Sequence, residues 1–155
     1  MAGEIEARLK ELGIVLPAPG KPAANYVPHV VSGKLLFISG QVPLTPEGVK
    51  FVGKVGREYS IEEGQQAARL CAINVLGVAK AAVGDLERIQ RIVKVVGFVN
   101  ATPDFPDVHK VVNGASDLIT EVLGDARGKH ARSAIGMGTL PLGVAVEIEA
   151  IAEIA

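Results

Sequence analysis

The chain closes on "HARSAIGMGTLPLGVAVEIEAIAEI", residues 130–154, and this segment says most about the architecture. Its second half alternates between apolar and other residues, a pattern typical of a half-buried β-strand. Apolar side chains occupy every second position from Val144 to Ile154, and Glu147, Glu149 and Glu153 lie on the opposite face. The segment therefore predicts a strand with one face in the core and one face that carries carboxylates.

Arg132 lies in a second predicted strand, "ARSAIGM", just before a Gly/Pro-rich turn. Two strands joined by such a turn would bring Arg132 close to Glu147, as an ion pair or as half of a small-molecule site. The small neighbours Ala131, Ser133 and Ala134 leave room around a guanidinium, whose planar fork suits a carboxylate. The residues alone leave both interpretations open: Arg132 is a surface or ion-paired arginine or a ligand-binding one, and Glu147 is its partner or a catalytic carboxylate.

The rest of the chain predicts helices that alternate with strands. Ser60 and Glu63 have the spacing of a capping box, and Gly33 suits a tight hairpin. Residues 45–59 read as a loop. The expected elements, in chain order, are a short helix ending at Gly13, a Pro-rich connector, strands over 27–31 and 35–39, a helix over 60–83, a strand within 88–101, a helix over 107–123, and the two closing strands.

This order predicts a single α+β domain over residues 1–155, in which residues 1–24 form the N-terminal helix and connector. A mixed sheet is packed by two long helices on one face. The sheet face that carries Glu147 and Glu149 then has no cover from this chain. It meets either water or other subunits, and the apolar character of the strand favours subunits.

Composition limits the function classes. Hydrophobic residues make up 48% of the chain and charged residues 21%, enough apolar material for a core. No apolar run reaches the roughly 18 residues of a transmembrane helix. The N-terminus does not resemble a secretory signal, and Cys71, the only cysteine, fits the apolar pattern of a helix. We therefore expect a cytoplasmic protein without disulfides and without a membrane partner.

Nucleic acid is an improbable main partner, because the net charge is −1 and aromatic residues make up only 4%. The basic cluster 127–132 reads either as a solvated loop or as a contact for RNA phosphates. His29, His109 and His130 lack metal-ligand spacing, so neither a metal nor another cofactor is expected.

Several motifs in order resemble one known family. "LLFISGQVPL", then a capped helix, then "VVGFVN" with "DF" and "VN", then "ARSAIG" and "LPLGVAVEIEAIA" resemble the RidA family, also called YjgF or L-PSP. The matching segments cover most of residues 26–152. The N-terminal helix and the longer segment between Phe98 and Asn113 resemble the longer-chain branch, which is described as endoribonuclease-like.

The resemblance implies a chorismate-mutase-like fold assembled as a homotrimer, with an inner barrel of sheets and sites in clefts between subunits. It implies hydrolytic deamination of reactive 2-imino or enamine acids, of the 2-aminoacrylate and 2-iminobutyrate type, to 2-keto acids and ammonia without a cofactor. The family's site residues fall on these positions: Arg132, Glu147 and Tyr26 for catalysis, and Arg132, Gly40, Ser133 and Asn113 for substrate binding, with Arg132 on the substrate carboxylate.

Two departures from the family pattern adjoin the arginine. Ala134 stands where many members have cysteine, and Gly136 stands where they often have a charged residue. The pocket wall is therefore expected to differ. Two alternative functions remain open: a weak endoribonuclease or translation inhibitor that uses Arg127, Lys129 and His130, and a non-catalytic regulatory protein that binds small carboxylates through Arg132.

Overall fold

A computed structural model describes residues 3–21 and 24–155 of the chain. Residues 1–2 and 22–23 of the expected N-terminal segment lie outside the described part. The elements, in chain order, are α1 (Glu4–Glu11), β1 (His29–Ser32), β2 (Leu35–Gln41), β3 (Leu44–Thr45), β4 (Gly48–Val49), α2 (Ile61–Val83), a 3-10 turn (Leu86–Arg88), β5 (Ile89–Asn100), α3 (Val108–Leu123), α4 (Asp125–Gly128), β6 (Ala131–Met137), a 3-10 turn (Pro141–Gly143) and β7 (Val146–Ile154).

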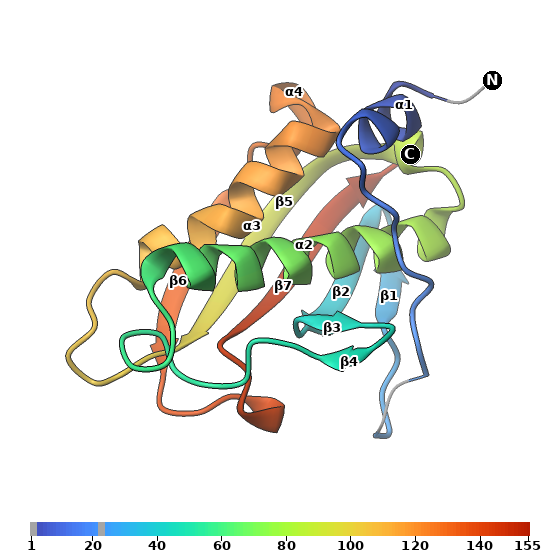
Figure 1. The fold of residues 1–155 in the computed structure, drawn as a ribbon. Coiled ribbons are helices and arrows are strands. Elements are labelled where there is room, and N and C mark those ends of the chain that lie inside the picture. The colour runs from blue at the N-terminus through green and yellow to red at the C-terminus, as the bar shows by residue number, and fades with distance from the viewer. Residues whose placement is uncertain (1–2, 22–23) are drawn as a thin grey trace.

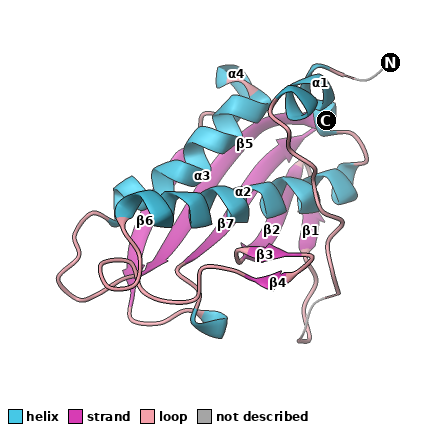
Figure 2. Cartoon of the chain, viewed as in Figure 1, coloured by secondary structure: helices cyan, strands magenta, loops and turns pink. Residues whose placement is uncertain are grey.

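Five strands form one mixed sheet in the order β1-β2-β7-β5-β6, and both long helices lie across one of its faces (Figures 1 and 2). Only the β5–β6 pair is parallel among the described strands, because α3 makes the crossover between them. The expected two-layer α+β arrangement is confirmed. The segment 45–59, expected to be a loop, contains most of the small β3–β4 hairpin, whose two-residue strands are too short to show alternation.

The two-layer core lies between the helices and the sheet. Along β7, Val146, Ile148 and the next alternate residues are buried, while Glu147 and its alternates are half-buried, as the alternation predicts. The capping box of α2 is also confirmed: the Ser60 hydroxyl accepts from the Glu63 N–H at 3.2 Å, and the Ser60 N–H donates to the Glu63 carboxylate at 3.1 Å.

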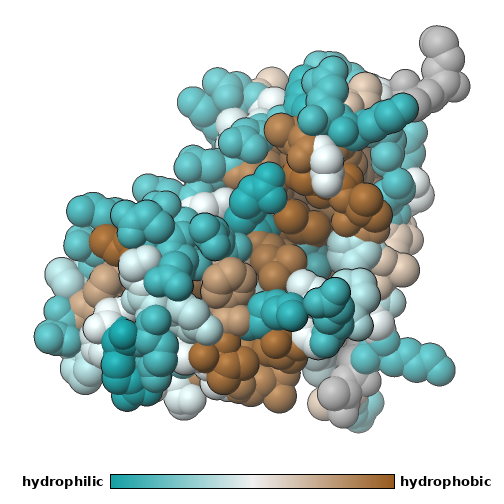
Figure 3. Space-filling model, in the orientation of Figure 1, coloured by the Kyte–Doolittle hydropathy of each residue, from teal (hydrophilic) through white to brown (hydrophobic). Residues whose placement is uncertain are grey.

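The 23-residue helix α2 is long and apolar enough, by length and mean hydropathy, to pass a test for a membrane-crossing helix. Its apolar composition serves the core instead, because 61% of that window is buried inside the fold, Cys71 included. Seen from the helix side, hydrophilic residues cover most of the surface and apolar residues show in groups between them (Figure 3).

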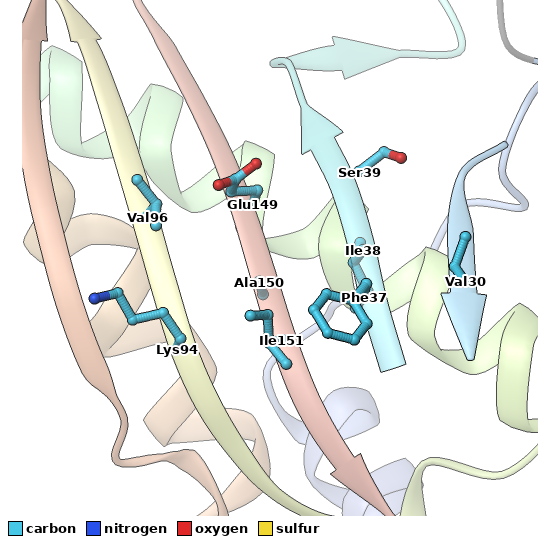
Figure 4. Close-up of a pocket in the computed structure, with 9 residues that line it drawn as sticks. All are labelled: Val30, Phe37, Ile38, Ser39, Lys94, Val96, Glu149, Ala150 and Ile151. Atoms are coloured by element: carbon cyan, nitrogen blue, oxygen red, sulfur yellow. The ribbon is translucent and has the colours of Figure 1, made fainter. Parts of the chain in front are cut away.

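No helix of the described part of the chain lies over the opposite face of the sheet (Figure 1). A cavity of about 270 Å³ lies on this open face and is shown in Figure 4. Val30, Phe37, Val96 and Ile151 give it an apolar wall, and Phe37 is 41% exposed. The open face therefore combines an apolar wall with the carboxylates of β7, and the described residues leave it uncovered.

Candidate functional site

Arg132 lies on β6, on the side of the sheet that the helices cover. Its partner across the strand pair is Val95, which is fully buried beneath the helices. Helix α3 holds the guanidinium: Nη1 donates to Asn113 Oδ1 at 2.8 Å and to Ser116 Oγ at 3.2 Å, and Nη2 donates to the His109 carbonyl at 3.2 Å. Arg132 is thus fixed by neutral acceptors.

The charge of Arg132 has no oppositely charged partner among the described residues. Among the residues that the structure describes, Arg132 enters no salt bridge. A guanidinium has five N–H groups, and three are used here, which leaves Nε–H and one N–H of Nη2. Two N–H groups on one edge of a guanidinium can bind both oxygens of a carboxylate.

The residues of α3 that accept hydrogen bonds from Arg132 belong to a polar stripe on the helix. Of this stripe, only Asn113 was expected from the sequence to be a site residue. His109, Asn113, Ser116 and Thr120 recur at spacings of four, three and four residues along α3. Such spacing places residues on one face of a helix. The stripe was the available signal for Ser116, but nothing in the sequence identified the His109 carbonyl as an acceptor.

Glu147 lies on the open face of the sheet, where its partner on β5 is Phe98. Gly40 approaches it from β2, at a register shift between Ile38 and Gln41. A β-carbon at position 40 would collide with the Glu147 carboxylate, so this close approach requires glycine. Burial raises the pKa of Glu147 above its ordinary value, and repulsion from Glu149 raises it further. A carboxylate with a raised pKa is suited to accept a proton.

Tyr26 belongs to the same end of the molecule. A cavity of about 230 Å³ is lined by residues that include Tyr26, Gly40, Gln41, Pro19 and Leu44. Tyr26 is 55% exposed. The structure therefore brings Tyr26 and Glu147 together only through Gly40, which contacts the carboxylate and shares the cavity with the tyrosine.

The candidate residues fall into two separate groups. Arg132 and Asn113 lie at the β6–α3 edge, whereas Gly40, Glu147 and Tyr26 lie near β2 and β7. The expectation that the turn between the last two strands brings Arg132 next to Glu147 is wrong within one chain, because β5 lies between β6 and β7. Their strand partners Val95 and Phe98 also face opposite sides of β5.

The residues next to Arg132 follow the alternation of β6. Ser133 pairs with Val96 and faces the open side, so Ser133 reaches the Arg132 side only through its backbone. Ala134 and Gly136 continue the helix-facing side, where Ala134 packs on the core. The wall beside the guanidinium is therefore built from small residues.

In the basic cluster, Lys129 pairs with Asp125 at 3.6 Å and His130 bonds to Ser116 and Gly128, whereas Nδ1 of His29 is buried without a hydrogen-bond partner among the described residues. Arg127 pairs with Glu87 at 2.8 Å. Within residues 3–21 and 24–155, no group of three or more His, Cys, Asp or Glu side chains is placed to hold a metal ion.

The chain is similar to several known proteins. Residues 6–154 match the family described as "YjgF/chorismate_mutase-like, putative endoribonuclease". The chain is 47% identical to protein TCP17 of Trypanosoma cruzi over 153 residues, which cover 99% of this chain and 96% of the relative.

Solved structures agree with the fold. Protein Atu1372 of Agrobacterium tumefaciens has a TM-score of 0.90 and 50% identity, with 97% of this chain and 93% of that one covered. The "Putative reactive intermediate deaminase TdcF" of Escherichia coli K12 is 31% identical over 138 residues, 87% of this chain and 90% of the relative. The structure of TdcF with bound serine has a TM-score of 0.63 and 28% identity, with 91% and 96% of the two chains covered.

Proposed function

Because this chain belongs to the YjgF/chorismate mutase-like family, we propose that it hydrolyses reactive 2-imino acids to 2-keto acids and ammonia. The observation that carries the proposal is the partly buried guanidinium of Arg132, which is held in place by neutral acceptors and has N–H groups to spare. A relative described as a reactive intermediate deaminase and its structure with bound serine, an amino acid with a carboxylate, support the same chemistry.

Arg132 binds the substrate carboxylate in this proposal. Hydrogen bonds to charged groups contribute about 1.5–3 kcal/mol each. Asn113 and Ser116 keep the guanidinium from turning, so that binding fixes the orientation of the imine carbon. The small side chains of Ala134 and Gly136 leave space beside the clamp for the substrate.

Glu147 activates the water. Its carboxylate takes a proton as the water oxygen bonds to the carbon of the protonated imine, which gives a carbinolamine. That proton then passes to the nitrogen. The Glu147 carboxylate takes the proton of the new hydroxyl group as the C–N bond breaks, the keto acid and ammonia leave, and ammonia takes up this last proton as ammonium. The raised pKa of Glu147 suits these proton transfers. Tyr26 donates a hydrogen bond to the substrate, and its share of the cavity with Gly40 supports this role.

One chain cannot complete this site, since Arg132 and Glu147 lie on opposite faces of the sheet. A second copy resolves the conflict if its β6 edge lies against the Gly40 end of the first. We propose a homotrimer in which three open sheet faces form an inner barrel and each cleft combines Arg132 of one subunit with Glu147 of another. The uncovered apolar wall around Phe37 supports this burial.

The test is the release of keto acid from 2-iminobutyrate or 2-aminoacrylate generated in situ. Wild type is expected to exceed the buffer rate, and Arg132→Ala and Glu147→Gln are expected to fall to it. Arg57→Ala is the matched control, because that arginine is 63% exposed and pairs only with the adjacent Glu58. A wild type that binds serine but accelerates no imine would contradict catalysis and favour a carboxylate-binding protein.

A further inference from the structure

A third cavity lies beside Arg132, and its wall is basic and polar. It encloses about 270 Å³ and opens to solvent. Its wall consists of Ser116 and Thr120 from α3, Lys129 and His130 from the segment before β6, and Arg132 itself. Of the described residues that line it, none carries a carboxylate. Two basic side chains, two hydroxyls and a histidine form a wall suited to an anion.

The hydrogen bonds of His130 fix which ring nitrogen carries the proton in its neutral form. Nδ1 lies 2.6 Å from the Gly128 carbonyl, which can only accept, so Nδ1 carries the proton. Nε2 then accepts from the hydroxyl of Ser116 at 2.9 Å. Burial lowers the pKa of His130 below its ordinary value, and the charge of Arg132 lowers it further, against the hydrogen bond to Gly128. The imidazole is therefore neutral near pH 7.

Protonation of His130 would reverse the hydrogen bond to Ser116. Nε2 would become a donor, and the Ser116 hydroxyl, which also accepts from Arg132 Nη1 at 3.2 Å, would be free to donate elsewhere. Thr120 would not respond, since its hydroxyl donates to the Ser116 carbonyl at 2.9 Å. One proton thus adds a positive charge and a free hydroxyl donor to the cavity.

We propose that this cavity binds a tetrahedral oxyanion, a phosphate or sulfate group, and that binding is coupled to protonation of His130. The charged groups that face His130 are Arg132 of β6 and the adjacent Lys129, while α3 contributes only hydroxyls. Asp125 of α4 pairs with Lys129 at 3.6 Å, but both side chains are more than 70% exposed, so the pair is weak.

The coupling follows from electrostatics and is reciprocal. An anion next to Arg132 offsets the charge that opposes protonation of His130, so the anion favours the protonated imidazole. Protonation must then strengthen anion binding by the same factor. The binding claim is independent of the proposed deaminase activity. Only one consequence rests on that function: the oxyanion competes with the substrate carboxylate for Arg132.

The test measures the Kd of sulfate by isothermal titration calorimetry, in chloride buffers of matched ionic strength. Sulfate is chosen because its charge stays constant over the range in which histidine titrates. Wild type is expected to bind sulfate about tenfold more tightly at about pH 5 than at about pH 8. In parallel, the ring-proton signals of His130 should titrate at higher pH when sulfate is present.

Two variants locate the effect. His130→Gln keeps a hydrogen-bonding side chain that does not titrate, so its sulfate affinity should be equal at both pH values. His29→Gln removes a histidine elsewhere and should keep the wild-type dependence. Equal sulfate affinity of the wild type at both pH values, or a pH dependence that survives in His130→Gln, would overturn the proposal. If His130→Gln fails to fold, the wild-type His130 titration with and without sulfate decides.

The source of the oxyanion is resolved in separate titrations at about pH 5. Inorganic phosphate and a phosphomonoester, O-phosphoserine, are compared with sulfate. Tighter binding of the ester assigns the cavity to a phosphorylated metabolite, and equal binding assigns it to the free ion. Binding of neither, with sulfate also unbound, would contradict an oxyanion site. Because these readouts do not use imine hydrolysis, a failure of the deaminase proposal would leave them unchanged.

Discussion

Arg132 and Glu147 face opposite sides of the same sheet, with β5 between their strands. Arg132 pairs with the buried Val95 on the helix side, and Glu147 pairs with Phe98 on the open side. Among the residues that the structure describes, neither Arg132 nor Glu147 enters a salt bridge. Each subunit offers two half-sites, and this relationship underlies the predictions that follow.

Replacement of Arg132 by lysine should remove most of the activity although the charge is kept. Lysine has three N–H groups on a single nitrogen, so it cannot keep the bonds to Asn113 and Ser116 and also bind both oxygens of a carboxylate. We expect KM to rise about 10- to 100-fold. This rise corresponds to the loss of about 1.5–3 kcal/mol, the contribution of one hydrogen bond to a charged group. Initial rates over a range of substrate concentrations measure it, and activity within about twofold of wild type would refute the bidentate clamp.

Glu147→Gln should lower kcat about 10²- to 10⁴-fold, the usual contribution of a general base, with little effect on KM. Only the ionised carboxylate accepts a proton, so the wild-type rate should rise with pH through the raised pKa of Glu147. The variant should lack this rise. A pH–rate profile of kcat for both proteins tests the assignment, and the same rise in the variant would assign the base elsewhere.

Glu147→Gln, which should lower kcat, should raise the stability of the fold. Because burial raises the pKa of Glu147, the folded state disfavours the charged form. The protonated Glu147 side chain therefore stabilises the fold at low pH. This stabilisation is lost as the pH rises through the pKa that Glu147 has in the folded state. Glu147→Gln should therefore resist denaturant better than wild type at neutral to alkaline pH and equally at acid pH. A variant that is less stable than wild type at neutral pH would contradict the conclusion that the folded state disfavours the ionised Glu147 side chain.

Gly40→Ala tests the contact between β2 and the carboxylate. The added methyl group meets the Glu147 carboxylate, which must move. We expect a kcat at least about tenfold lower, since small displacements of catalytic groups are costly. Gly138→Ala is the control, because a β-carbon there meets nothing within 4 Å and the backbone needs no positive φ. Equal activity of the two variants would show that Gly40 does not position Glu147.

Phe37→Glu tests whether the open sheet face is an interface. The wild-type mass by light scattering is expected to be three times the 16.1 kDa of one chain. A charge in place of the 41% exposed Phe37 should shift it to one chain, because a carboxylate would be buried without a partner. Val15→Glu, at an 88% exposed position on the N-terminal connector, should remain trimeric. A monomeric wild type would contradict the proposed assembly.

Local patterns predicted the elements well. The alternation along β7 and the capping box of α2 depend on neighbours in sequence, and both are found as expected. The helix expected over 107–123 is found as α3, and the side chain of Asp107, the residue before it, makes no capping hydrogen bond. The resemblance to a family supplied the candidate residues, whose roles remain predictions.

The relation between elements was harder to predict. Strands joined by a short turn are usually neighbours, which suggested that Arg132 and Glu147 meet. The parallel crossover through α3 instead places β6 outside β5, while β7 pairs on the other side of β5. The register shift at Gly40 and the bonds of His130 to Ser116 and Gly128 also depend on contacts that no local pattern encodes.

The central claim is that Arg132 and Glu147 act from different subunits, and mixing two inactive variants tests it most directly. Arg132→Ala and Glu147→Gln are refolded together in equal amounts, and each is also refolded alone. In a symmetric ring whose sites lie between neighbours, about one quarter of the sites would then combine an intact Arg132 with an intact Glu147. We predict that the mixture recovers imine hydrolysis at about one quarter of the wild-type rate. A mixture as inactive as its two components, with exchange of subunits shown by mass spectrometry, would contradict a site shared between chains.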